Sequence, residues 1–362
     1  MKDITLIFLL ILSLSTGYAE KPQLSFFCEL QGKEFSELFA DSALISQLLD
    51  MHASLRIGLH DFSLERTQTI KKINQAGIPI IAWLLLPEKD GYWFNMYNGE
   101  IAEKRYDEFK HWTDENQIKW AGLGIDLEPD INDIKLALSH RWKFAWKVYR
   151  RLYDNQSLKK GQIIYQALIT KMRKDGFTVE SYIIPWLYEE RETGTTSFQK
   201  LLGIVDIETD KEIPMLYTSM TGNPSLIQVY HRDNQPIALG STGGGINIDG
   251  IELASLGWDK LQRDLLIASK LTDEIHIFCL ETSVQQNLLE KISSMDFNQE
   301  APDIHFGIVK QKKIAAVTRF ILKALNHPFL LTVTFFGIVS LLTWGIVKLI
   351  SIILRITGMK RM

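Results

Sequence analysis

The sequence predicts an α/β protein built on a (β/α)8 TIM barrel, and two observations lead to that fold class. Between residues 24 and 284, a short apolar run followed by a helical pattern occurs eight times. Strands that alternate with helices pair in parallel through right-handed crossovers, and eight such units close into a barrel. An open, doubly wound sheet is the alternative, because the same alternation builds it. The expected strands are residues 24–30, 55–62, 78–87, 122–128, 177–186, 213–220, 236–241 and 274–281.

Glycine residues mark the ends of two expected helices. The segment Leu64–Ala76 stops at Gly77, and a later helical segment stops before Gly176. Glycine just past the last turn is a common helix terminator, since it adopts the left-handed conformation without strain. Between residues 131 and 174 the pattern indicates two helices where a minimal barrel needs one.

Composition limits the class of protein. The chain has 362 residues, 46% hydrophobic and 23% charged, which leaves room for one large core, so we expect a single barrel domain over residues 20–300. The formal net charge of −3 offers no excess of positive charge. Nucleic acid is therefore not expected as a partner.

Both ends of the chain carry apolar runs. Residues 1–19 combine Lys2, a short apolar centre, and the small residues Gly17 and Ala19 at the positions of a cleavage site. We interpret them as a secretory signal peptide rather than an uncleaved anchor. Residues 328–347 form an uncharged run long enough to cross a bilayer, so we expect a transmembrane helix there.

The expected membrane helix lies between two basic segments, a juxtamembrane linker over residues 301–327 and a short tail over residues 348–362. Because cationic residues flank the span on both sides, the positive-inside rule does not decide its orientation. The signal peptide does, and it places the barrel on the extracytoplasmic side of a single-pass protein.

Residues 120–130, WAGLGIDLEPD, end an apolar strand in two carboxylates. Side chains alternate along a strand, so Asp126 and Glu128 share one face with Gly122 and Gly124, and the aliphatic residues between them share the other. In a barrel the small, acidic face points inward and the aliphatic face packs on the helices. Both carboxylates then lie at the mouth, where active sites of these barrels form. Two carboxylates on one face repel each other, which raises one pKa.

Other strand ends bring more carboxylates and aromatic residues to the same mouth. No cluster of His and Cys at ligand spacing accompanies them, so we expect no metal and no cofactor. His60 is interpreted as a hydrogen-bonded structural residue rather than a base. The expected rim residues are Glu29, His60, Asp61, Trp83, Glu88, Asp126, Glu128, Trp186, Glu189, Tyr217, Ser241 and Glu281.

Two loops at the mouth each have two interpretations. The aromatic residues Tyr92, Trp93 and Tyr97 could stack on sugar rings, or they could cap the barrel as a small satellite core. The glycine-rich residues 240–245 could bind a phosphate through backbone amides, or they could form an ordinary flexible loop.

The chain has two cysteines, Cys28 and Cys279, which fall on the first and eighth expected strands. These strands are neighbours in a closed barrel. Side chains on adjacent parallel strands rarely meet disulfide geometry, so we expect two nearby free thiols.

The mouth resembles the family 18 glycoside hydrolases, the chitinase type, whose fourth strand ends in Asp-x-x-Asp-x-Asp-x-Glu. Asp126 and Glu128 fill the last two acidic positions, and Ala121 and Gly124 stand at the first two. The Met-x-Tyr-Asp pattern of the sixth strand is kept in Met215 and Tyr217, followed by threonine in place of aspartate. The third strand lacks the Ser-x-Gly-Gly of chitinases, so the resemblance is to a divergent relative.

The resemblance implies a role for three residues. Glu128 would be the general acid, Asp126 would orient a substrate group, and Tyr217 would donate a hydrogen bond to the reacting sugar. Such hydrolysis needs a carboxyl group that stays protonated and donates to the leaving oxygen. Around these residues we expect the substrate-binding side chains Trp83, Trp93, Trp186, Glu29 and Glu281.

These observations predict a membrane-anchored extracytoplasmic glycosidase, an O-glycosyl hydrolase that acts on a β-linked glycan, N-acetylated glycans included. The alternative is a TIM barrel that binds a glycan without cleaving it, because the two upstream acidic residues are missing. An enzyme of phosphate-bearing substrates that uses residues 240–245 is a third interpretation.

Overall fold

The computed structural model describes residues 21–245, 248, 254–334, 336–337, 340–341, 343–344 and 348. The predicted signal peptide lies outside the described residues. So does the predicted basic tail, apart from Lys348.

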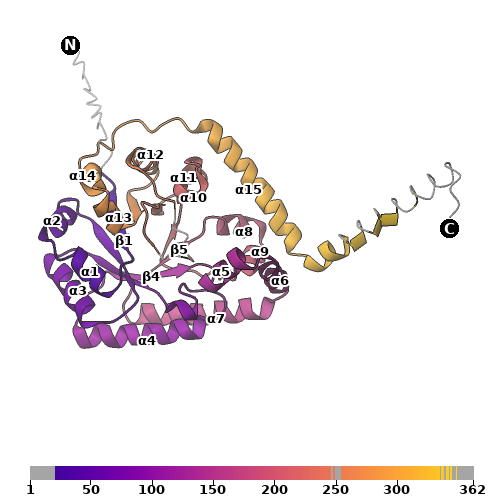
Figure 1. Cartoon of the computed structure of the whole chain (residues 1–362), viewed down its shortest axis with the longest axis horizontal. Helices are drawn as coiled ribbons and strands as arrows, with labels where there is room; N and C mark the ends of the chain where they lie inside the picture. The colour runs from indigo at the N-terminus through magenta and orange to yellow at the C-terminus, as the bar shows by residue number, and fades with distance from the viewer. Residues whose placement is uncertain are drawn as a thin grey trace, which may run out of the picture.

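Eight parallel strands form the centre of the molecule, as the sequence predicts (Figure 1). Their order in the sheet is β6-β5-β4-β3-β2-β1-β8-β7, and an isolated parallel bridge between Met215 and Ala238 links the two ends. The barrel is therefore nearly closed and has no reversal of strand order, which excludes the open doubly wound sheet. The strands are β1 (Gln23–Cys28), β2 (Ser54–Leu59), β3 (Ile80–Leu84), β4 (Gly122–Leu127), β5 (Val179–Ile183), β6 (Lys211–Pro214), β7 (Ile237–Gly240) and β8 (Glu274–Phe278).

Several strands end earlier than their apolar runs predict. The third strand was expected over residues 78–87, but β3 ends at Leu84. Leu85 and Leu86 follow it in a loop and are buried at 0% and 1% exposure. An apolar run indicates that residues are buried, but it does not show that they pair in a sheet. A buried loop at the barrel mouth is therefore easily predicted as part of a strand.

Helices surround the strands, and local sequence explains their ends. The side chain of Ser63 caps α3 by accepting a hydrogen bond from the backbone of Arg66 at 3.3 Å, and Gly77 ends the helix at φ 85°. Residues 131–174 hold three helices rather than two, because Asp154 starts a new one by capping the backbone of Ser157 at 2.9 Å. The helices are α1 (Gly32–Leu38), α2 (Ser42–Asp50), α3 (Leu64–Ala76), η1 (Glu88–Asp90), α4 (Gly99–Asn116), α5 (Ile131–Ser139), α6 (Arg141–Arg151), α7 (Asn155–Lys174), α8 (Leu187–Thr193), α9 (Ser197–Leu202), α10 (Thr218–Thr221), α11 (Ser225–Tyr230), α12 (Trp258–Ala268), α13 (Leu280–Gln285), α14 (Leu288–Ser293) and α15 (His305–Leu325).

The apolar side chains form two cores, one between strands and helices and one inside the barrel. Leu123, Ile125 and Leu127 of β4 belong to the outer core. Gly124 faces inward, because a Cβ atom there would lie 2.1 Å from the hydroxyl of Tyr182, a residue of the inner core. The predicted inward and outward faces of β4 are thus confirmed.

Charged residues fill the amino-terminal end of the barrel. The guanidinium of Arg56, which is 2% exposed, donates to both carboxylate oxygens of Glu180 at 2.7 and 2.9 Å and to Glu274 at 3.3 Å. The hydroxyl of Tyr182 donates to Glu180 at 2.7 Å and ties the aromatic layer to this floor. A cavity inside the barrel must therefore open toward the carboxyl ends of the strands.

The two cysteines occupy the expected strands. Cys28 ends β1 and Cys279 follows β8, and β1 pairs directly with β8. Both thiols are free and buried. This confirms neighbouring, unbridged cysteines.

Most of the predicted linker over residues 301–327 is helix α15, which lies along one side of the barrel (Figure 1). Arg319 of α15 donates to Glu189 and to Glu192, both at 2.7 Å, and Asn223 donates to Gln311 of α15 at 2.9 Å. The helix is therefore docked on the body.

The predicted span over residues 328–347 is described only in part. Among the described residues, no helix taken alone combines the length and apolar character needed to cross a membrane. Helix α15 and Pro328–Thr334 meet both conditions together, but they are bent by 90° with respect to each other.

Candidate active site

A cavity of about 380 Å³ lies at the carboxyl ends of the strands. Seven of the eight predicted site residues line it: Glu29, Trp83, Trp93, Asp126, Glu128, Trp186 and Tyr217. The eighth, Glu281, lines a neighbouring cavity that shares Glu29 and Gly245 with the first. Strand register brings these side chains together, since each lies at or just beyond the end of a strand or in a loop over the mouth.

Asp126 and Glu128 are neighbouring carboxyl groups at the base of the cavity, close enough to affect each other's pKa. Asp126 is 2% exposed, whereas Glu128 is partly exposed to the cavity. Burial raises the pKa of Asp126 well above its usual value, and the charges of Glu128 and Glu29 raise it further. Burial also raises the pKa of Glu128 to about 7, although the hydrogen bond with Asp126 lowers it. Asp126 is therefore the group that holds its proton more tightly and can donate to Glu128, and Glu128 takes up a proton near neutral pH.

This pair corrects one detail of the sequence-based expectation. Repulsion between two carboxylates was expected to raise the pKa of the acid. Instead, burial raises the pKa of Glu128, and Asp126 acts on it as a hydrogen-bond donor rather than as a second charge. The repulsive effect falls on Asp126.

Trp83 supplies a polar atom beside this pair. Its indole lowers the pKa of Asp126, which burial raises, so the two groups are close. Within the described part of the chain, however, neither Nε1 of Trp83 nor Oδ1 of Asp126 has a partner at normal hydrogen-bond geometry. A buried polar atom without a partner costs about 1–3 kcal/mol. A ligand that bonds to both atoms would remove that cost.

Aromatic side chains hold Trp83 in place. Its ring lies edge-on to Phe27 and Tyr182, with centroids 5.4 and 6.0 Å away and interplanar angles of 79° and 88°. Tyr217 completes the wall against Phe278 at 5.8 Å. Burial and the nearby charges of Asp126 and Glu128 raise the pKa of Tyr217 well above its usual value, so its hydroxyl stays protonated.

Glu29 is a third carboxyl group on the cavity and is held by its own partners. The hydroxyl of Tyr92 donates a hydrogen bond to Oε1 of Glu29. Burial raises the pKa of Glu29 to about 8, although Tyr92 lowers it, and the charges of Glu281 and Glu128 raise it. Glu29 is therefore mostly protonated at neutral pH. The Tyr92 contact was not predicted, because residues 92 and 29 are far apart in the sequence.

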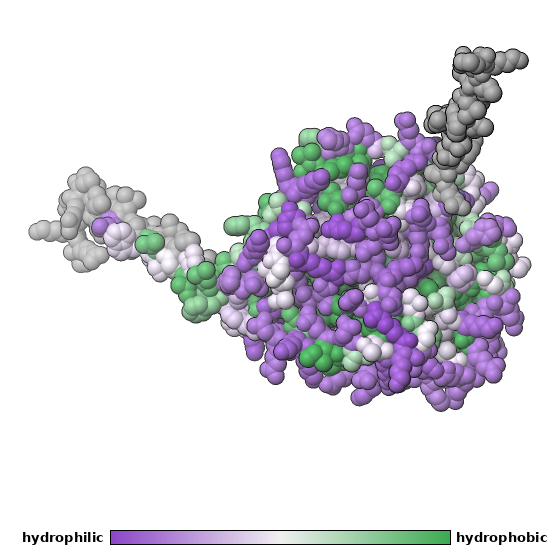
Figure 2. All heavy atoms as spheres, turned by 180° about the vertical axis from the view of Figure 1, so that it is seen from behind, coloured by the Kyte–Doolittle hydropathy of each residue, from purple (hydrophilic) through white to green (hydrophobic). Residues whose placement is uncertain are grey.

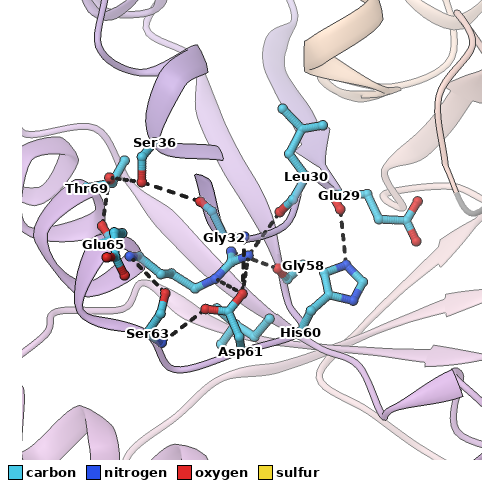
Figure 3. A network of polar contacts seen from close by, with 12 residues as sticks. Glu29, Leu30, Gly32, Ser36, Gly58, His60, Asp61, Ser63, Glu65 and Thr69 are labelled. Carbon is cyan, nitrogen blue, oxygen red and sulfur yellow. Dashed lines mark hydrogen bonds and ion pairs between the residues drawn. The ribbon is translucent and has the colours of Figure 1, made fainter. Parts of the chain in front are cut away.

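His60 has the structural role expected from the sequence. Its Nε2 atom lies 3.1 Å from the backbone carbonyl of Glu29, as Figure 3 shows. Burial and the charge of Arg66 lower the pKa of His60 to about 4, so the ring is neutral near pH 7. It positions the end of β1 rather than carrying charge into the cavity.

Asp61, an expected rim residue, lines the neighbouring cavity and also belongs to the polar network of Figure 3. The Arg66 guanidinium donates to Asp61 at 3.1 and 3.0 Å, and also to the backbone carbonyls of Gly58 and Leu30. Burial would raise the pKa of Asp61, but Arg66 and Ser63 hold it well below its usual value. The network locks together the loops that follow β1 and β2.

Three other expected rim residues also have partners elsewhere. Glu88 pairs with Lys135 of α5. Glu189 pairs with Arg319 of α15. Ser241 is fully buried and donates to the backbone carbonyl of Gly243 at 2.9 Å. They were expected at the rim because each follows a strand, but the loops carry them away from the cavity.

The aromatic loop after β3 combines both of its interpretations. Tyr92 and Trp93 are 3% and 7% exposed and belong to the inner core, as a cap would. Trp93 also lines the cavity, whereas Tyr97 lies outside it and is 48% exposed. Of the three aromatic residues of this loop, only Trp93 is therefore placed to contact a ligand in the cavity.

The described part of the glycine-rich loop faces carboxyl groups. A Cβ atom on Gly245 would lie 3.3 Å from Oε2 of Glu29, and one on Gly244 would lie 3.4 Å from Oε1 of Glu281. Three of the amides already have acceptors: Ser241 donates to Ser219 at 2.8 Å, Thr242 to the Phe278 carbonyl at 2.8 Å, and Gly243 to Ser241 at 2.9 Å. Nearby carboxyl groups, and amides that already have acceptors, both disfavour the binding of a phosphate by this loop.

The position after Tyr217 holds threonine where the chitinase pattern has aspartate. The Thr218 hydroxyl donates to Asp264 of α12, outside the barrel. As for metals, no group of three or more His, Cys, Asp or Glu side chains in the described ranges could hold an ion.

No protein-family model and no curated protein sequence matches the chain. Among solved structures, it is similar to a GH18 chitinase from Pseudoalteromonas aurantia, with 11% identity over 75% of this chain and 98% of that one, and a TM-score of 0.45. Gas2p of Saccharomyces cerevisiae, in complex with laminaritetraose and laminaripentaose, is 9% identical over 80% of this chain and 68% of that one, with a TM-score of 0.41.

A D-allulose 3-epimerase from Methylomonas sp. is also similar, with 10% identity over 82% of this chain and 98% of that one, and a TM-score of 0.36. All three identities are 11% or less and all three TM-scores are below 0.5. The chemistry of the cavity therefore rests on the residues of this chain alone.

Proposed function

We propose that this barrel is a glycoside hydrolase that acts on a β-linked glycan, N-acetylated glycans included. One observation carries the proposal: two neighbouring carboxyl groups, Asp126 and Glu128, lie at the base of a cavity walled largely by aromatic side chains. Aromatic walls suit the apolar faces of sugar rings. The carboxyl group of Glu128, with its pKa near 7, suits proton donation at neutral pH.

In this mechanism Glu128 gives its proton to the glycosidic oxygen while the bond from that oxygen to the anomeric carbon breaks. The leaving sugar departs as an alcohol, and positive charge develops on the ring that remains. Water then adds to the anomeric carbon and returns a proton to Glu128. On an N-acetylated sugar, the acetamido oxygen can attack the anomeric carbon as the leaving sugar departs, and water then opens the ring so formed. The role assigned to Asp126 is to support the acetamido group.

Replacement of Glu128 by glutamine tests the role of the acid. Glu128→Gln keeps the size and a hydrogen-bond donor but cannot give up a proton, so turnover of a natural glycosidic bond should fall by about 10² to 10⁴. A chromogenic chitobioside, whose leaving group needs little acid help, should lose less. Glu88→Gln is the matched control, because Glu88 also follows a strand at the mouth but pairs with Lys135. Full activity of Glu128→Gln on both substrates would eliminate the assignment.

A glycan-binding barrel without catalysis is the second candidate, favoured by the missing acidic residues at positions 121 and 124. It predicts that the wild-type protein binds oligosaccharides with no turnover at any pH. Product analysis on any glycan that binds separates the two.

The proposal includes a membrane anchor at residues 328–347 and a barrel outside the cytoplasm. Exposed apolar side chains where the C-terminal segment leaves the body support the anchor, among them Phe329 and Leu330 at 73% and 62% exposure (Figure 2). The signal peptide proposed for residues 1–19 supplies the orientation.

A further inference from the structure

The cavity has two chemically different parts. Its base carries the carboxyl groups of Glu29, Asp126 and Glu128. Besides the aromatic side chains, its remaining wall includes seven aliphatic or thioether side chains: Ile134, Leu138, Ile184, Met215, Met220, Leu226 and Ile248. These side chains offer no strong hydrogen-bond donor or acceptor.

The aliphatic part of this wall is unsuited to a sugar ring. Each sugar hydroxyl that leaves water without a new partner costs free energy, whereas an alkyl group gains from the same transfer. Aromatic rings can stack on sugars, but branched aliphatic side chains and methionine serve as general apolar surface. A ligand that satisfies both parts has a sugar at the base and an alkyl chain along the wall.

The apolar wall continues to the protein surface. Leu138 of α5 and Met220 of α10 line the cavity, and they are 46% and 66% exposed. An alkyl chain that leaves the cavity would therefore pass between exposed apolar side chains. A polysaccharide chain would meet the same side chains in place of a polar rim.

Helix α6 begins two residues after α5 ends, and its exposed surface suits a lipid bilayer. Trp142 and Trp146 are 89% and 62% exposed, beside the cations of Arg141, Lys143 and Arg150. Exposed tryptophan with cationic neighbours is typical of helices that lie in the membrane interface.

Helix α6 also lies where the C-terminal segment leaves the body (Figure 1). The hydroxyls of Tyr149 on α6 and Thr332 on that segment are 3.0 Å apart. Helix α6 therefore adjoins both the apolar rim at Leu138, which precedes it in the chain, and the segment proposed to enter the membrane.

We propose that the substrate is an amphiphile, a sugar head group on an alkyl or acyl chain, which the cavity takes from the bilayer surface beside α6. The sugar head occupies the carboxyl base, and the chain lies along the apolar wall and leaves past Leu138 and Met220. The sugar end of this assignment rests on the proposed function, while the chain end rests on the wall and the rim.

Binding of a homologous series tests the proposal independently of turnover. The full chain carrying Glu128→Gln, held in lipid nanodiscs, is titrated with butyl, hexyl and octyl N-acetyl-β-glucosaminides, and affinity is followed by tryptophan fluorescence. Full burial of one methylene strengthens binding about four-fold. We expect affinity to rise at least several-fold with each two-carbon step.

Matched variants locate the chain. Adding Leu138→Asn and Met220→Gln should flatten the dependence on chain length, and both sites are exposed, so folding should be unaffected. Ile163→Asn is the control, because Ile163 is 61% exposed on α7 and does not line the cavity. Affinity that does not change with chain length, or a gain that survives the double change at the rim, would overturn the proposal.

Two further arms separate this proposal from the proposed function. Octanol that binds as tightly as the octyl glycoside would show that the sugar head is not recognised, which overturns the amphiphile. If the wild-type protein hydrolyses a chromogenic chitobioside but binding does not depend on alkyl length, the proposed hydrolase function would be supported and the amphiphilic substrate would be ruled out. Chain-dependent binding with no turnover of any glycoside would keep the amphiphile and remove the hydrolase.

Discussion

The ionisation of Glu128 gives the proposed reaction its dependence on pH. The carboxyl group must be protonated to donate, and burial raises its pKa to about 7. Activity should therefore be level below about pH 7 and should fall about ten-fold per pH unit above it. A pH profile of kcat/KM on a natural glycan measures this directly, and a basic limb near the usual pKa of glutamate would contradict it.

A hydrogen bond from Asp126 lowers the pKa of Glu128 and so affects the pH at which activity begins to fall. Two substitutions show whether Asp126 acts as a hydrogen-bond donor or as a charge. Asp126→Asn keeps a donor toward Glu128, so the basic limb should stay near its wild-type position. Asp126→Val removes the donor that lowers the pKa of Glu128, so the limb should move to higher pH. If both variants moved the limb to lower pH, Asp126 would be acting as a charge.

Gly124 is required by its neighbour across the barrel. A Cβ atom at this position would lie 2.1 Å from the Tyr182 hydroxyl, which is held by Glu180 at 2.7 Å. Gly124→Ala should therefore lower the free energy of unfolding by about 1–3 kcal/mol, measured by denaturant titration. Gly257→Ala, with no atom within 4 Å of its added Cβ, is the control. Adding Tyr182→Phe to Gly124→Ala should restore part of the loss.

At the scale of one element, an ion pair holds helix α15 on the body. Arg319 pairs with Glu189, which is 3% exposed, so Arg319→Gln leaves a buried carboxylate without its cation. The cost should be roughly 1–2 kcal/mol, less than the roughly 3–5 kcal/mol of a fully buried pair, because Arg319 is 35% exposed.

Hydrogen exchange of α15 measures that loss locally. Amides of His305–Leu325 should exchange faster in Arg319→Gln, while those of the barrel strands keep their wild-type rates. Lys323→Gln, which removes an exposed cation from the same helix, is the control. Unchanged exchange in Arg319→Gln would mean that apolar contacts alone hold the helix.

At the scale of the whole molecule, the proposed topology predicts where a protease can reach. With the barrel outside the cytoplasm and a single span near the C-terminus, protease added to intact cells should remove the body and leave the basic tail protected. Antibodies against residues 254–300 and against residues 348–362 would follow the two parts. Protection of the body together with loss of the tail would reverse the orientation.

Much of the fold could be predicted because it depends on local pattern. The strand alternation of β4 fixed which side chains face the barrel, and Gly77 ended α3 where expected. Strand ends could not be predicted as well. Buried loop residues such as Leu85 are as apolar as strand residues, and no local signal separates them.

The candidate site was also only partly predictable from the sequence. Asp126, Glu128 and Tyr217 could be placed at the mouth because each lies at a strand end, whereas Glu189 follows a strand but turns away to α15. The bond from Tyr92 to Glu29 had no signal in the sequence. Contacts between distant segments depend on how loops pack, which periodicity does not record.

By itself, the sequence determined eight strands and helices in alternation, two carboxylates at a strand end, and two cysteines on neighbouring strands, because spacing along the chain sets all of these. Only the tertiary structure decided what those carboxylates experience. Burial is the largest cause that raises both pKa values, and the interaction between Asp126 and Glu128 comes second. The apolar wall of the cavity was also decided by the tertiary structure. Its residues lie far apart in the chain, share no motif, and come together only because α5, α10 and the strand ends meet.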